Sequence, residues 1–140
     1  MPYPEPIQEF IENIALIDDR AERVQVLIDM GKSFQPPAIE KPYPAENRVP
    51  GCESEVYTWV NLNTQSTLDI QIVVDNPQGL SAMAMAQLLL EGLQNHPPAL
   101  ANLIDEDLVA KTFGPELSMG KSLGLTNLVR QIKAQALKLA

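Results

Sequence analysis

The chain has 140 residues and one cysteine, so it can bury the core of a single domain, and a disulfide-rich secreted scaffold is excluded. Its formal net charge of −8 argues against a nucleic-acid partner, because phosphate binding requires a clustered basic face. We therefore expect one acidic domain over residues 1–140 that works in a reducing compartment.

The charge is unevenly distributed along the chain. Residues 1–110 hold 5 basic and 17 acidic side chains, whereas residues 111–140 hold 5 basic and 1 acidic. This pattern predicts a solvated acidic surface and a basic final helix, and the basic end is also suited to an acidic partner.

No segment has the character of a membrane or export signal. Residues 1–6 lack the basic and apolar regions of a signal peptide. The longest apolar stretch, Leu80–Leu90, is interrupted by Ser81 and Gln87 and is too short to span a bilayer. We expect a cytoplasmic protein that does not contact a membrane.

The first third of the chain predicts two helices and an extended segment. Apolar residues at helical spacing over residues 6–16 indicate an amphipathic helix. Asp19 with Glu22 resembles a capping box for a second helix, which Gly31 is expected to end at the C′ position. Four prolines within residues 33–47 then favour a stiff, extended surface loop.

The middle of the chain predicts an antiparallel hairpin. Residues 55–62 are rich in β-branched and aromatic side chains, and residues 67–74 alternate polar and apolar side chains, with the apolar ones forming a buried face. Residues 63–66 between them are turn-like. Residues 80–93, which follow, are apolar on all sides, as is typical of a buried central helix.

Three further helices are expected near the C-terminus. A short one begins at Pro97-Pro98 and continues through Ile104, one capped by Asp105 continues through Lys111, and the last carries an apolar stripe from Leu125 to Leu139. Helices, a hairpin and helices in this order indicate an α+β fold, with a small antiparallel β-sheet packed with helices in a single domain.

Cys52 is the main candidate for chemistry. It follows Pro50 and Gly51, between the proline-rich segment and the first predicted strand, where a partner can reach it. A single thiol cannot form an internal disulfide or supply a metal cage by itself. If Cys52 has a function, it acts as a nucleophile or carries a covalently attached group.

The sequence around this cysteine resembles the SufE family, the sulfur acceptors that work with cysteine desulfurases in iron–sulfur cluster assembly. The family pattern is roughly Val-x-Gly-Cys-x-Ser-x-Val-aromatic. It is matched by Val49, Gly51, Cys52, Ser54, Val56 and Tyr57. The order of predicted elements and the chain length are also similar to a stand-alone member, and the implied fold is SufE/IscU-like.

The resemblance implies that Cys52 accepts persulfide sulfur from a SufS-type cysteine desulfurase, stimulates that enzyme, and passes the sulfur to a downstream iron–sulfur scaffold complex. Pyridoxal phosphate would belong to the desulfurase, so we expect no cofactor or metal on this chain. The resemblance also implies that the Cys52 thiol lies in a hydrophobic hollow, which would shield a persulfide. The sequence leaves the oligomeric state open, with a homodimer among the candidates.

Four further residues are candidates for supporting Cys52. Arg48 and Lys121 would lower the thiol pKa if they lie near it, against the opposite effect of neighbouring acidic residues. Gly51 allows a sharp turn and the approach of a partner loop. Ser54 would hydrogen-bond the loop backbone or the thiolate. Each also has an ordinary interpretation, as a solvated side chain, a turn glycine or a strand-edge hydroxyl.

Two segments depart from the family pattern. Relatives commonly read Gly-Asp-Ser-Asp-Ala after the hairpin, where this chain has Asp75-Asn76-Pro77-Gln78-Gly79. Relatives also tend to have an arginine before the final helix, at the position of Lys121. Lysine keeps the charge but lacks the planar guanidinium, so these departures bear on the choice of partner.

Other site chemistries fit the sequence poorly. A Cys–His dyad with His96, the sole histidine, would require proximity and an orienting third group. Gly120-Lys121-Ser122 lies between predicted helices and lacks the upstream spacing of a phosphate loop. Two alternatives to a sulfur acceptor stay open: a non-catalytic docking regulator of a desulfurase or scaffold, and a peroxide-reactive thiol sensor.

Overall fold

A computed structural model describes residues 3–140, apart from the side chain of Glu116. Two N-terminal helices, α1 (Glu5–Ala15) and α2 (Arg20–Ser33), precede a two-stranded antiparallel sheet of β1 (Glu55–Leu62) and β2 (Leu68–Asp75). The helices α3 (Leu80–Leu93), α4 (Asp107–Phe113) and α5 (Met119–Leu137) follow. Three short 3-10 helices occupy Ala45–Asn47, Pro98–Leu103 and Gly114–Glu116.

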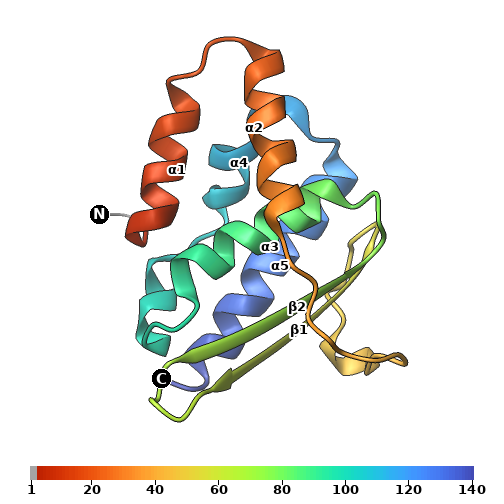
Figure 1. The fold of residues 1–140 in the computed structure, drawn as a ribbon, viewed down its shortest axis with the longest axis vertical. Coiled ribbons are helices and arrows are strands. Elements are labelled where there is room, and N and C mark those ends of the chain that lie inside the picture. Colours follow the sequence, from red (N-terminus) through yellow and green to blue (C-terminus); the bar gives the residue numbers. More distant parts are fainter. Residues whose placement is uncertain (1–2) are drawn as a thin grey trace.

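The elements pack around α3, which contacts α1 and α2 on one side and β2 and α5 on the other (Figure 1). Its largely apolar sequence suits this position, and the prediction of a buried central helix is confirmed. α5 lies against β1, so the inner face of the hairpin is enclosed by helices. The core is formed by Val56, Leu68, Ile70, Ile72, Met85, Leu88, Leu89, Leu125, Leu128 and Ile132. The predicted α+β fold is confirmed.

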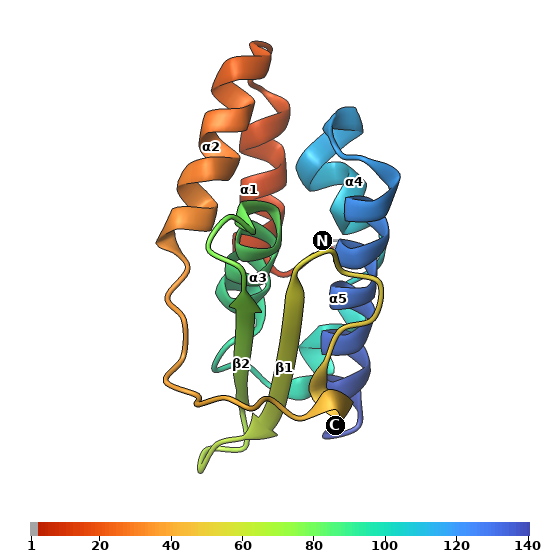
Figure 2. The ribbon, with the colours of Figure 1, turned by 90° about the vertical axis from the view of Figure 1, so that its right-hand side faces the viewer.

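The hairpin register is regular, from Glu55 opposite Asp75 to Leu62 opposite Leu68. The predicted alternation in β2 is confirmed, with Leu68, Ile70 and Ile72 facing the core. Part of the outer face is also covered, because the proline-rich segment crosses it (Figure 2). In that segment the Tyr43 ring lies 4.9 Å from the Tyr57 ring and 6.3 Å from the Trp59 ring. The segment therefore covers part of the sheet and also connects α2 to β1.

Three sequence-based boundaries were wrong. α2 continues past Gly31 to Ser33, because Gly31 packs against α3 where a side chain would lie 2.8 Å from the Leu80 carbonyl. The Asp105 carboxylate does not cap α4; it accepts a hydrogen bond from the Tyr3 hydroxyl at 2.7 Å. α5 begins at Met119, with Ser118 accepting from the Lys121 amide, so Gly120-Lys121-Ser122 lies in its first turn.

None of the helices in the described part of the chain is long and apolar enough to cross a membrane.

Candidate functional site

Cys52 lies on a short loop, residues 50–54, whose two ends are fastened together. Val49 is fully buried, and its amide donates to the Val56 carbonyl at 2.7 Å. Arg48 forms an isolated antiparallel bridge with Tyr57. These contacts join residues 48 and 49 to β1, so the two ends of the loop lie next to each other. The Cys52 loop is therefore held in a defined conformation at the start of β1.

The tip of the loop lies directly on α5. Gly51 has a φ of +76°, a conformation that favours glycine, and this turn brings Cys52 toward the helix. The Cys52 Sγ–H donates to the Gly124 carbonyl at 3.2 Å. A Cβ on Gly124 would lie 2.8 Å from the Cys52 Cα and 3.0 Å from Sγ. Only glycine at position 124 leaves room for the loop in this position.

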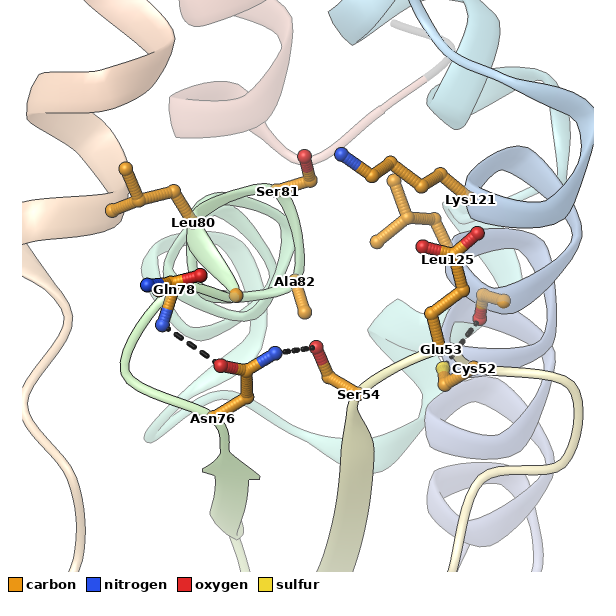
Figure 3. A pocket seen from close by; sticks show the side chains of 12 residues that line it. Cys52, Glu53, Ser54, Asn76, Gln78, Leu80, Ser81, Ala82, Lys121 and Leu125 are labelled. Atoms are coloured by element: carbon orange, nitrogen blue, oxygen red, sulfur yellow. Dashed lines mark hydrogen bonds between the residues drawn. The ribbon is translucent and has the colours of Figure 1, made fainter.

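The thiol borders a pocket of about 190 Å³ between four parts of the fold. Figure 3 shows the Cys52 loop, the turn after β2, the start of α3 and the first turns of α5 around it. Cys52 itself is half-buried. The other lining residues are Glu53, Ser54, Asn76, Gln78, Gly79, Leu80, Ser81, Ala82, Lys121, Gly124 and Leu125. The structure thus brings together three of the predicted residues, Cys52, Ser54 and Lys121, in one pocket.

Ser54 connects the Cys52 loop to the turn after β2. Its hydroxyl accepts a hydrogen bond from Asn76 Nδ2 at 3.1 Å, and Asn76 Oδ1 accepts from the Gln78 amide at 2.9 Å (Figure 3). The sequence-based expectation that Ser54 bonds the loop backbone or the thiolate was wrong. The Asp75–Gly79 segment, which departs from the family pattern, therefore forms one wall of the thiol pocket.

Burial raises the pKa of the Cys52 thiol, and the positive charge of Arg48 opposes this only in part. The Arg48 guanidinium also lies 4.0 Å from the Glu55 carboxylate, which accepts a hydrogen bond from the Tyr57 hydroxyl at 2.9 Å. Because the net pKa is raised, the thiol of this conformation is protonated at neutral pH and can donate to Gly124.

Lys121 faces the same pocket from the first turn of α5. Its side chain is exposed and extends toward Ser81 at the start of α3 (Figure 3). Lys121 therefore brings a positive charge to the pocket that Cys52 borders, and the sequence analysis named it as a candidate to lie near the thiol.

The structure separates His96 from Cys52. The His96 carbonyl accepts a hydrogen bond from the Leu68 amide at 2.8 Å, at the turn end of the hairpin. Cys52 adjoins the opposite end, and strands of eight residues span roughly 25 Å. A Cys–His dyad is therefore excluded in this conformation.

Three residues that shape the site were missed by the sequence reasoning: Asn76, Gly124 and Asn127. Asn127 on α5 donates through Nδ2 to the Pro50 carbonyl at 2.9 Å. Gly124 carried a signal, because a glycine inside a helix costs about 1 kcal/mol relative to alanine and often marks a close approach. The two asparagines carried no sequence signal, because their partners are distant in the chain.

Comparison with known proteins identifies the family of the chain. The family model described as "SufE: Fe-S metabolism associated domain" matches residues 8–136. The chain is 24% identical to an uncharacterized SufE-like protein of Rhizobium etli over 132 residues, which cover 93% of this chain and 88% of that protein.

A solution structure of a hypothetical protein from Thermus thermophilus has a similar fold. Its TM-score is 0.76 at 19% sequence identity, over 98% of this chain and 97% of the other. The family match spans nearly the whole chain, and the one cysteine of the chain lies on a loop beside a pocket. The protein therefore belongs to the SufE family of domains associated with iron–sulfur metabolism.

Proposed function

We propose that the protein is a sulfur acceptor, and that Cys52 takes the outer sulfur of a persulfide carried by a pyridoxal-phosphate-dependent cysteine desulfurase. The observation that carries the proposal is the half-buried thiol at the tip of a fastened loop, beside a pocket of about 190 Å³. The pocket is of a size to surround an added sulfur, and the loop holds the thiol at the molecular surface.

The transfer is a thiol–disulfide exchange in which no external oxidant or reductant is consumed. The Cys52 thiolate attacks the outer sulfur of the partner's persulfide. A new S–S bond forms on Cys52, the S–S bond on the partner breaks, and the partner's cysteine leaves as a thiolate with the electron pair. A second exchange of the same kind passes the sulfur to the machinery that assembles clusters, which we place in the cytoplasm.

Cys52 must lose its proton before it attacks, and the conformation described here opposes that loss. The Gly124 carbonyl accepts the S–H but cannot take the proton, and burial raises the thiol pKa. Activation therefore requires the loop to leave α5, or a partner to bring a base or a positive charge to it. The same raised pKa argues against a peroxide sensor, because sensor thiols are typically of low pKa and accessible.

An apolar surface beside the thiol suits contact with a protein partner. Met119 is 91% exposed and Leu123 is 53% exposed, on the first turns of α5, and Leu123 lies next to Gly51. Large apolar side chains exposed together next to a reactive group are typical of interaction sites. A desulfurase that covered them would also exclude water from the sulfur being transferred.

The proposal is tested by incubating the purified protein with an active cysteine desulfurase and free cysteine, then measuring its intact mass without reductant. We expect a gain of one sulfur atom that maps to Cys52, is removed by reductant and is absent in Cys52→Ser. If no sulfur is gained while the desulfurase is active, the acceptor function is wrong. Stimulation of the desulfurase by Cys52→Ser would then favour a docking regulator.

A further inference from the structure

Besides the Cys52 thiol itself, the Asn127 side chain ties the tip of the Cys52 loop to α5. Asn127 Nδ2 donates to the Pro50 carbonyl at 2.9 Å, two residues before Cys52. A side chain on Gly51 would lie 3.0 Å from the same nitrogen, so the Asn127 amide packs directly on the backbone that turns toward the thiol. This hydrogen bond must break whenever the loop moves away from the helix.

Arg130 contacts the oxygen end of the Asn127 amide. Its Nη1 donates to Asn127 Oδ1 at 3.4 Å, while its Nε is bound by the Glu106 carboxylate at the start of α4. An amide oxygen only accepts and an amide nitrogen only donates. A guanidinium at Oδ1 therefore directs Nδ2 toward the Pro50 carbonyl.

We propose that Asn127, oriented by Arg130, is a positioning residue that holds the Cys52 loop in its tucked conformation and so limits access to the thiol. In this conformation the Cys52 Sγ donates to the Gly124 carbonyl, a contact that a protonated thiol makes and a thiolate cannot. The loop has to open before Cys52 reacts, and opening breaks the Asn127–Pro50 bond. The proposed function enters this inference at one point, the identity of the partner that reacts with the thiol once the loop has opened.

The first test measures alkylation of Cys52 by iodoacetamide as a function of pH, which requires no desulfurase. In Asn127→Ala we expect the rate at neutral pH to rise about five-fold, which corresponds to the loss of one hydrogen bond of ordinary net strength. The pH midpoint of the rate should also fall, because the released thiol is less buried. This variant leaves unchanged the charged side chains near Cys52, which are Arg48, Glu53 and Lys121.

Gln135→Ala is a matched control. Gln135 lies on α5, and its Oε1 accepts a hydrogen bond from the buried Thr58 hydroxyl at 2.6 Å. Its loss removes a bond between α5 and β1 without touching the loop, so alkylation should stay at the wild-type rate. Asn127→Leu is a second variant of nearly the same shape, with a methyl group opposite the Pro50 carbonyl and no added charge, and it should raise the rate as alanine does.

A double-mutant cycle tests the place of Arg130. If Arg130 acts by orienting Asn127, Arg130→Ala should raise alkylation about two-fold in the wild-type chain and have no effect in Asn127→Ala. Equal effects in both backgrounds would overturn this role. A wild-type rate and pH midpoint in both folded Asn127 variants would overturn the whole inference. Failure of Cys52 to gain sulfur would contradict the proposed function but leave these alkylation results unaffected.

Discussion

Replacing Gly124 by alanine tests whether the Cys52 loop packs on α5 as described. The new Cβ would lie 2.8 Å from the Cys52 Cα and 3.1 Å from the Gly51 carbonyl oxygen. Both are backbone atoms of the loop, which therefore has to move. Overpacking of this kind costs about 1–3 kcal/mol, which corresponds to roughly a 5- to 150-fold shift toward the open loop.

The rest of the fold should tolerate the change. Alanine is about 1 kcal/mol more favourable than glycine inside a helix, which offsets part of the cost within α5. We therefore expect Gly124→Ala to unfold at nearly the wild-type temperature while its thiol reacts with iodoacetamide at least about five-fold faster.

Gly120→Ala is the matched control, since it makes the same substitution in the same helix. A Cβ there would lie 2.9 Å from a Glu53 carboxylate oxygen, the far end of a flexible side chain that can turn away. Thiol reactivity should stay unchanged in this variant. A Gly124→Ala protein that is folded and alkylated at the wild-type rate would refute the described packing of the loop on α5.

Three further predictions follow from contacts around the thiol. Because burial raises the pKa of Cys52, the folded protein binds its thiol proton more tightly than the unfolded chain. Its stability should therefore fall as the pH rises above the ordinary cysteine pKa, and denaturant unfolding of Cys52→Ser should lack this part of the pH dependence. Arg48→Gln should raise the pH midpoint of Cys52 alkylation, because the positive charge of Arg48 lowers the thiol pKa. Salt at about 1 M should reduce the difference in midpoint between the variant and the wild-type protein. An unchanged midpoint at low salt would contradict an electrostatic role for Arg48. Ser54→Ala should lower the free energy of unfolding by about 0.5–1.5 kcal/mol, and Asn76→Ala should lower it further because Asn76 also accepts from the Gln78 backbone amide. The double variant should cost little more than Asn76→Ala alone, because both substitutions remove the Ser54–Asn76 bond; full additivity would contradict a direct bond.

The sequence by itself determined the α+β fold and its order of helices, hairpin and helices. Periodicity was sufficient because each element has one dominant pattern: the alternation of Leu68, Ile70 and Ile72 along a strand, and the apolar residues on all sides of α3. It also singled out Cys52, since the chain has no second thiol and the residues beside it match a family pattern. These inferences depend only on neighbours along the chain.

Helix ends and the surroundings of the thiol were decided by the tertiary structure. Gly31 looked like the end of a helix but lies inside one, because its missing side chain makes room for α3. Ser54 was expected to serve the thiol, yet it bonds Asn76, 22 positions away. The thiol of Cys52 donates to Gly124, 72 positions away, and Asn127 reaches Pro50 from 77 positions away. Such contacts depend on how α5 packs against the hairpin, and a linear pattern does not contain that packing.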